Sequence, residues 1–300
     1  MTTSWLVTGA RGLLGRDVLA ELGADPDAAV TGLSRDQLDI TDPTAVRTAV
    51  DGHRVVVNCA AWTDVDGAEQ AEAAATAVNG TGVRHLARAC ADSGAVLLHI
   101  STDYVFPGDA RQPYPEDAPT SPVNAYGRGK LAGERAVVEL LPRTGYVVRT
   151  AWLYGAHGSN FVATMLRLAA QREMLDVVAD QHGQPTWSRA LAGQLAVLGR
   201  AALAGRAPAG IYHGTAGGHT TWYGLAPETF RLSGLDPERI RPVGSVAFPR
   251  PAARPAFGVL GHSSWPRTGL VPLPRWDAQL TAALDTPAFA ALAAAARSSS

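Results

Sequence analysis

The chain has 300 residues, a formal net charge of −1, 46% hydrophobic residues and 18% charged residues, which is typical of a globular protein. No basic excess is available to neutralise a phosphate backbone, and no apolar run approaches the roughly 18 residues of a membrane span, so neither nucleic acid nor a membrane is an expected partner. Only two cysteines occur, Cys59 and Cys90, and no secretory pattern opens the chain, which favours a cytoplasmic protein.

Alternating strands and helices in the first half of the chain predict an α/β fold, with a Rossmann-type doubly wound parallel sheet. Short apolar runs mark the strands, and apolar residues at helical spacing mark the helices. The expected strands are 5–7, 29–33, 55–58, 95–100 and 146–149. Helices are expected after the glycine turn at 9–15 and over 45–50, 67–92 and 125–140, the third interrupted near Asn79-Gly80.

The pattern changes after Trp152. We expect a helix over 161–172, a short apolar stretch over 175–179, a helix over 189–204 and a strand over 210–213 that returns to the main sheet. The Pro- and Arg-rich stretch 247–275 is expected to be ordered but irregular, and 277–296 to form a final helix. These elements predict a dinucleotide-binding domain of residues 1–152 plus about 187–213. A smaller C-terminal substrate-binding lobe would comprise about 153–186 and 214–300.

A glycine-rich turn follows the first strand, with Gly9, Gly12 and Gly15 spaced by two residues each. Glycines let the backbone approach a pyrophosphate, and the helix that follows offers free N–H groups, although such turns also simply join a strand to a helix. The second strand ends at Ser34-Arg35 rather than at an acidic residue. An arginine there favours the 2′-phosphate of NADPH, while NADH stays possible.

Lys130 is the only lysine among 26 basic residues, and it lies four residues after Tyr126. That spacing places the two side chains on one helix face, and Thr102 closes a strand whose end should face the same crevice. A neighbouring ammonium lowers the pKa of a tyrosine. We therefore expect Tyr126, Lys130 and Thr102 to form a proton donor aimed at an oxygen that gains charge. Arg254 could pair with a substrate diphosphate through its guanidinium fork.

The chain resembles the dTDP-4-dehydrorhamnose reductase family of extended short-chain dehydrogenases/reductases. The resemblance spans nearly the whole chain and is most specific in 57–66, 101–106, 124–134, 149–155, 160–169 and 180–186. It implies hydride transfer from NAD(P)H to C4 of a dTDP-linked 4-keto-6-deoxyhexose. Tyr126 would donate the proton, Lys130 would bind the nicotinamide ribose and Thr102 would tune the tyrosine.

The expected site residues combine these patterns with the resemblance. The cofactor would contact Tyr126, Lys130 and the residues Gly9, Gly12, Leu13, Leu14, Gly15, Ser34, Arg35, Asp39, Ile40, Ala60, Ala61, Trp62 and Thr63. The sugar nucleotide would contact Thr102, Asp103, Tyr104, Trp152, Asn160 and Arg254.

The chain departs from the family at three positions where some members hold magnesium with glutamates at a dimer interface. Asp17, Arg189 and Asp277 stand there, and an arginine cannot ligate a cation, so we expect no metal and a monomer or weak homodimer. The sequence does not identify the sugar, and an antibiotic deoxysugar of the dihydrostreptose type is an alternative substrate. A non-catalytic NADP-binding regulatory subunit is an alternative function, although the complete set of Thr102, Tyr126 and Lys130 argues against it. Tyr104 replaces the second acid of 4,6-dehydratases, which disfavours dehydration.

Overall fold

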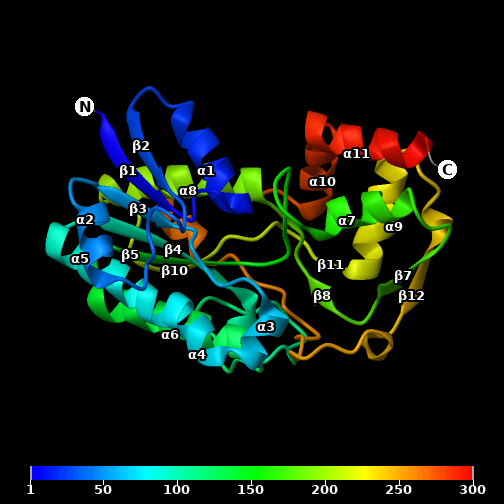
Figure 1. Ribbon diagram of the computed structural model, residues 1–300, viewed down its shortest axis with the longest axis horizontal. Coiled ribbons are helices and arrows are strands. Elements are labelled where there is room, and N and C mark those ends of the chain that lie inside the picture. Colours follow the sequence, from blue (N-terminus) through cyan, green and yellow to red (C-terminus); the bar gives the residue numbers. More distant parts are fainter. Residues whose placement is uncertain (1, 299–300) are drawn as a thin grey trace.

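The computed structural model describes residues 2–298 and shows two lobes side by side (Figure 1). The larger lobe is built on a six-stranded sheet with the order β10-β5-β4-β3-β1-β2, in which every neighbouring pair is parallel. This confirms the predicted doubly wound sheet, including the return of the strand at 210–213. The strands are β1 Thr3–Thr8, β2 Ala28–Leu33, β3 Val55–Asn58, β4 Val96–Thr102, β5 Gly145–Thr150 and β10 Gly210–His213.

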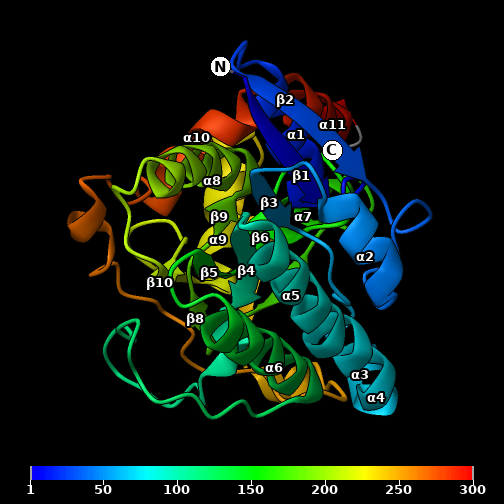
Figure 2. The same cartoon turned by 90° about the vertical axis from the view of Figure 1, so that its left-hand side faces the viewer.

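Helices cover both faces of the sheet, and the central strands are therefore buried on both sides. α1 (Leu13–Gly23) and α8 (Ser188–Leu203) pack on one face, and α2 (Pro43–Val50), α5 (Val83–Ser93) and α6 (Ala125–Leu140) cover the other. Figure 2 shows α5 and α6 together on one side of the strands and α8 on the opposite side. Because each face meets apolar helices, the strands are continuous hydrophobic runs rather than alternating ones.

The helix expected over 67–92 is divided into several pieces. α3 (Val65–Gln70) and α4 (Glu72–Thr76) lead into a π-helical turn at Ala77–Gly82, which then continues as α5. The turn lies where the interruption was predicted. It packs against α6 so closely that a Cβ on Gly133 would lie 2.3 Å from the backbone oxygen of Asn79, which explains why glycine occupies this contact.

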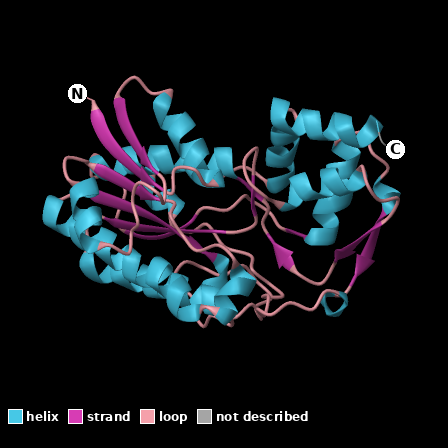
Figure 3. Ribbon diagram, viewed as in Figure 1, coloured by secondary structure: helices cyan, strands magenta, loops and turns pink. Residues whose placement is uncertain are grey.

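The smaller lobe is mainly helical, with short strands at its edge (Figure 3). Its hydrophobic core gathers side chains from α7, α9, α10 and α11, with Phe230 and Phe289 fully buried. These helices are Phe161–Ala169, Trp222–Leu232, Trp276–Leu284 and Pro287–Ser298. The short strands pair as β6 (Leu153–Tyr154) with β9 (Thr186–Trp187), β7 (Leu175–Val178) with β12 (Ile240–Val243), and β8 (His182–Gly183) with β11 (Thr220–Thr221).

Two sequence expectations differ from the structure. The single helix predicted over 277–296 is split at Asp285-Thr286 into α10 and α11, because Pro287 lacks the N–H that would continue α10. α7 ends at Ala169, three residues before the predicted end. The remaining short elements are 3-10 turns at Asp103–Val105, Pro237–Arg239, Ser245–Ala247 and Trp265–Thr268.

The Pro-rich stretch is ordered, and part of it packs on the larger lobe. The Phe257 N–H donates to the Gly108 carbonyl at 3.0 Å, and the Tyr114 N–H donates to the Val259 carbonyl at 2.9 Å. Trp265 is fully buried in the core beneath the main sheet. The stretch thus connects the two lobes rather than belonging to the smaller one alone. Within residues 2–298, no helix combines the length and hydrophobicity required to cross a membrane.

Candidate active site

A cavity of about 940 Å³ opens at the carboxyl ends of β1, β3, β4 and β5, the edge at which open parallel sheets bind ligands. Every predicted cofactor and catalytic residue lines this cavity. Among the predicted substrate residues, Thr102, Asp103, Tyr104 and Trp152 line it as well, whereas Asn160 and Arg254 do not.

The glycine turn forms a cradle that side chains would fill. Gly9 has a φ of +66°, and a Cβ there would lie 2.6 Å from the Ala60 nitrogen. A Cβ on Gly15 would lie 2.3 Å from the Gly9 carbonyl oxygen. α1 begins after Gly12 with no side-chain cap and no acidic residue in its first turn. The free helix N-terminus and the open backbone fit the pyrophosphate of a dinucleotide such as NADP.

The far end of the cradle holds the residues expected to distinguish NADPH from NADH. The Ser34 hydroxyl donates to Gln37 Oε1 at 2.9 Å, so its hydrogen is already engaged. Arg35 lines the cavity, and so does Arg11, whose Nη1 pairs with Asp36 Oδ2 at 2.6 Å. Sequence reasoning missed Arg11, although it lies inside the glycine turn where its position could have identified it.

Asn79 fixes the loop that follows β3. Its side chain accepts from the Trp62 N–H at 2.9 Å and donates to the Trp62 carbonyl at 3.0 Å. The wide π-helical turn brings this side chain to the loop, which explains why the helix is interrupted there. Asn58 holds the start of the same loop by accepting from the Ala60 N–H at 3.2 Å. These contacts position the predicted cofactor residues from Ala60 to Thr63.

Tyr126 and Lys130 share one face of α6, and Thr102 ends β4 beside them. Asn124 caps α6 by accepting from the Gly127 N–H at 2.8 Å, which places Tyr126 in the first turn. Lys130 is 2% exposed, and its ammonium donates to the Ile100 carbonyl at 2.6 Å. The structure therefore brings the three predicted catalytic residues to one wall of the cavity.

The pKa of Tyr126 departs from the direction expected from the sequence. Desolvation raises it above its ordinary value, the Asp103 charge raises it further, and the hydrogen bond with Thr102 lowers it. The expected lowering by Lys130 is wrong in this structure, because burial dominates and the ammonium is bonded to Ile100. Burial also lowers the pKa of Lys130 to about 8, against the opposing charges of Glu134 and Cys59.

Asp103 is a buried carboxyl directly beside the predicted catalytic residues. It is 3% exposed and accepts from the Thr102 hydroxyl at 3.0 Å. Burial raises its pKa to about 7, although hydrogen bonds from Thr102 and the backbone oppose that shift. Its neighbour Tyr104 meets Tyr126 edge to face, with ring centroids 5.9 Å apart. The wall thus contains a carboxyl that changes its charge near neutral pH.

Trp152 lies between β5 and β6 at the other side of the cavity. Its φ of +47° is the only positive value of a non-glycine residue in the described chain. Its indole stacks on that of Trp222 at 3.5 Å between centroids and 7° between planes. Trp222 also lines the cavity, and sequence reasoning missed it because nothing local links the start of α9 to Trp152.

Asn160 and Arg254 make internal contacts instead of lining the cavity. Asn160 caps α7 by accepting from the Ala163 N–H at 3.0 Å, and it donates to the Gly155 carbonyl at 2.8 Å. Arg254 pairs with Asp66 at 3.0 Å. Contact of Asn160 with a ligand stays a prediction, as does that of Arg254.

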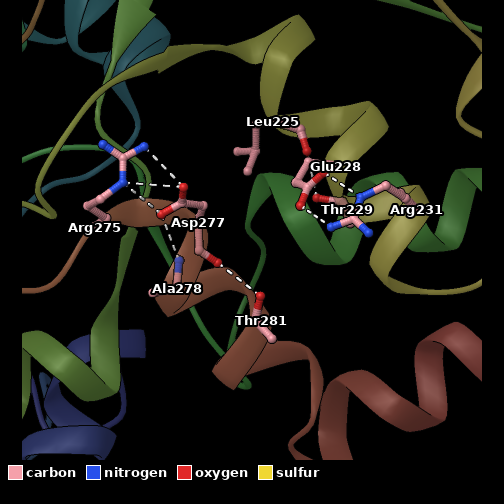
Figure 4. Close-up of polar contacts among 8 residues, drawn as sticks. All are labelled: Leu225, Glu228, Thr229, Arg231, Arg275, Asp277, Ala278 and Thr281. Carbon is pink, nitrogen blue, oxygen red and sulfur yellow. Dashed lines mark hydrogen bonds and ion pairs between the residues drawn. The ribbon is translucent and has the colours of Figure 1, made fainter.

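The three positions that match a metal site in some relatives have other contacts. Asp17 accepts from the Ser188 hydroxyl, and Arg189 lies over the Trp187 ring at 5.8 Å. Asp277 pairs with Arg275 at 3.1 Å, and Figure 4 shows the two side chains facing each other. Over residues 2–298, no group of three or more His, Cys, Asp or Glu side chains is placed to hold a metal ion.

Comparisons with known proteins agree with this geometry. The family described as "RmlD substrate binding domain" matches residues 3–288. A Streptomyces griseus protein named dTDP-4-dehydrorhamnose reductase is 63% identical over 92% of this chain and 91% of its own length. A Streptomyces niveus protein named dTDP-4-keto-6-deoxy-D-glucose reductase is 53% identical over 94% of this chain and 97% of its own. The crystal structure of Bacillus anthracis dTDP-4-dehydrorhamnose reductase in complex with NADP is 36% identical, with a TM-score of 0.89 over 95% of this chain and 99% of that one.

Proposed function

Because the chain belongs to the RmlD substrate-binding family, we propose that it reduces the C4 ketone of a dTDP-linked 4-keto-6-deoxyhexose with NADPH. The observation that supports this most directly is the joint position of Thr102, Tyr126 and Lys130 on the cavity that also contains the glycine cradle. The relatives' names supply the class of substrate. The chain is accordingly a sugar-nucleotide ketoreductase.

NADPH is the cofactor, in agreement with the NADP complex of the Bacillus anthracis relative. When bound, it supplies the hydride that forms the new C–H bond at C4. The glycine cradle at Gly9, Gly12 and Gly15 would hold its pyrophosphate, and the guanidinium groups of Arg11 and Arg35 would bind its 2′-phosphate. Lys130 would donate to the nicotinamide ribose. Its ammonium is held at the cavity wall by the hydrogen bond with the Ile100 carbonyl, which leaves other N–H groups to donate.

Tyr126 completes the reduction by donating its phenolic proton to the ketone oxygen, which takes the electron pair of the C=O π bond. The raised pKa keeps this phenol protonated in the resting protein. Thr102 would orient Tyr126, and its hydrogen bond with the phenol lowers the pKa that burial has raised. Asp103, Tyr104 and Trp152 would contact the sugar nucleotide.

Arg254 would reach the substrate diphosphate only after it leaves Asp66. The pair is partly exposed, at 20% and 25% of the two side chains, and exposed ion pairs are weak. A diphosphate can therefore compete for the guanidinium. If Arg254→Ala leaves the Michaelis constant of the sugar nucleotide unchanged, this contact is absent.

The test is consumption of NADPH with a panel of dTDP-4-keto-6-deoxyhexoses, followed by NMR of the product to identify the sugar and its C4 configuration. Tyr126→Phe should lower kcat by about 10²–10⁴-fold and leave the Kd for NADPH unchanged. Tyr223→Phe, at a tyrosine outside the cavity, is the matched control. Binding of NADPH without oxidation by any such sugar would contradict the proposal and favour a regulatory role.

A further inference from the structure

Trp152 has a backbone conformation that the rest of the structure must enforce. Its φ of +47° lies in the left-handed region, which a bulky residue rarely adopts. Strained residues persist only where their surroundings hold them, and they gather at functional sites. Trp152 is at such a place, because it lines the same cavity as Tyr126.

The side chain of Trp152 is held from the smaller lobe. Trp222, the first residue of α9, covers one face of the indole in a nearly parallel stack. Gly183 in β8 approaches the ring edge so closely that a Cβ would lie 2.3 Å from Trp152 Cε2. Trp222 is itself fixed, since its Nε1 donates to Gln181 at 3.2 Å and Phe161 packs on its ring at 4.6 Å. The indole therefore has little freedom to turn.

A fixed indole gives the sugar ring a flat apolar surface to pack on, which we call the Trp152 wall, and the position of this wall affects the stereochemistry at C4. The C–H faces of a pyranose ring are apolar and pack well on aromatic surfaces. The ketone carbon at C4 is prochiral, so the face that meets the hydride decides the configuration of the new alcohol. Because the dTDP group tethers the sugar at C1, we expect a ring lying on the fixed Trp152 indole to present one face of C4 to the hydride, whereas a mobile indole would let the tethered ring turn over.

We propose that Trp222 is a positioning residue that holds Trp152 as this wall and thereby determines the C4 configuration of the product. The proposal rests on the proposed function, because it needs a keto sugar in the cavity. It assigns the choice of face to a contact between the two lobes: Trp152 follows β5 of the larger lobe, while Trp222 and Gly183 belong to the smaller one.

The experiment compares Trp222→Leu, Trp222→Phe and the control Trp276→Leu. Trp276 packs at the edge of the same hydrophobic core but lies outside the cavity, so it reports on general weakening of the lobe. Each purified protein is assayed for the Kd for NADPH, the KM for the sugar nucleotide, kcat, and the ratio of C4 epimers in the product by NMR. The urea midpoint of each variant verifies that it is folded.

We expect Trp222→Leu to raise the KM about threefold to tenfold, as loss of an aromatic pair predicts, and to release a second C4 epimer. The Kd for NADPH should not change. Trp222→Phe should restore a single epimer, because a phenyl ring can still stack, and Trp276→Leu should behave as the parent. Gly183→Ala should repeat the Trp222→Leu result, since its Cβ would displace the indole.

A single product epimer with an unchanged KM in both Trp222→Leu and Gly183→Ala would overturn the proposal. So would a second epimer from Trp276→Leu at the same level. Failure of the proposed function is a different result, because the parent protein would then reduce no keto sugar at all.

Discussion

Replacement of Asp103 by Asn tests whether the buried carboxyl beside Tyr126, the proposed proton donor, titrates near neutral pH. Asn keeps the oxygen that accepts from the Thr102 hydroxyl at 3.0 Å and removes the proton equilibrium. Burial raises the pKa of Asp103 from its ordinary 3.8 to about 7. The folded protein then binds more protons than the unfolded chain between these values, so stability falls as pH rises through this range.

The size of the effect follows from about 1.4 kcal/mol for each pH unit between the two pKa values. Between pH 5 and pH 7 the parent protein should lose about 2–3 kcal/mol relative to Asp103→Asn, and above pH 8 the difference should be constant. Urea unfolding of the two proteins at half-unit steps from pH 5 to 8.5 measures it. Titrating histidines such as His213 and His262 occur in both chains, so their contributions cancel.

The reasoning fails if the difference in unfolding free energy between the two proteins is independent of pH. That result would mean that Asp103 is already ionised at pH 5 and that solvent reaches its carboxylate despite its 3% exposure. The Asp103 charge raises the pKa of Tyr126, so Asp103→Asn should also make the phenol a stronger acid. Because the proposed reaction needs a protonated phenol, the plateau of kcat against pH should extend to higher pH in the parent protein than in Asp103→Asn.

Three further variants test other contacts. Gly133→Ala should cost about 1–3 kcal/mol of stability, because its Cβ would lie 2.3 Å from the Asn79 oxygen; Gly23→Ala, with nothing within 4 Å, is the control, and equal urea midpoints would refute the packing argument. Lys130→Arg should weaken NADPH binding about tenfold to hundredfold by losing a charged hydrogen bond, and isothermal titration with unchanged affinity would contradict it. Glu134→Gln should lower the free energy of unfolding by about 3–5 kcal/mol, because the Arg149 charge would stay buried without an opposite charge. Glu134→Gln combined with Arg149→Met should recover part of this stability. A double variant that is no more stable to urea than Glu134→Gln would contradict this explanation.

The parts of the site that sequence predicted are those built from neighbouring residues. The glycine turn is a strand, a tight turn and a helix start within seven residues, and Tyr126 and Lys130 are one helical turn apart. Such features depend on local backbone geometry, so their chemistry can be inferred before the fold is known. The strand at 55–58 was predictable for a similar reason, because a run of three valines between turns leaves few alternatives.

What could not be predicted depends on residues distant in sequence. Nothing local shows that Trp222 stacks on Trp152, or that Asn79 bonds the backbone of Trp62. The direction of the Tyr126 pKa shift could not be predicted either. It depends on how deeply the phenol is buried in the folded chain and on which acceptor binds the Lys130 ammonium. Composition and spacing predict the reacting groups, but the tertiary structure sets the pKa values of those groups.

A buried ion pair links the two walls of the cavity. Arg149 of β5 makes two hydrogen bonds with Glu134, at 2.8 and 2.9 Å, and both residues are 2% exposed. Glu134 lies one turn after Lys130 on α6, and Arg149 lies three residues before Trp152. Because a buried pair tolerates little change in geometry, the helix that presents Tyr126 and the strand that leads to Trp152 share one rigid base. We therefore expect Tyr126 and the backbone of Trp152 to keep a fixed separation, while the stack with Trp222 in the smaller lobe sets the orientation of the Trp152 indole.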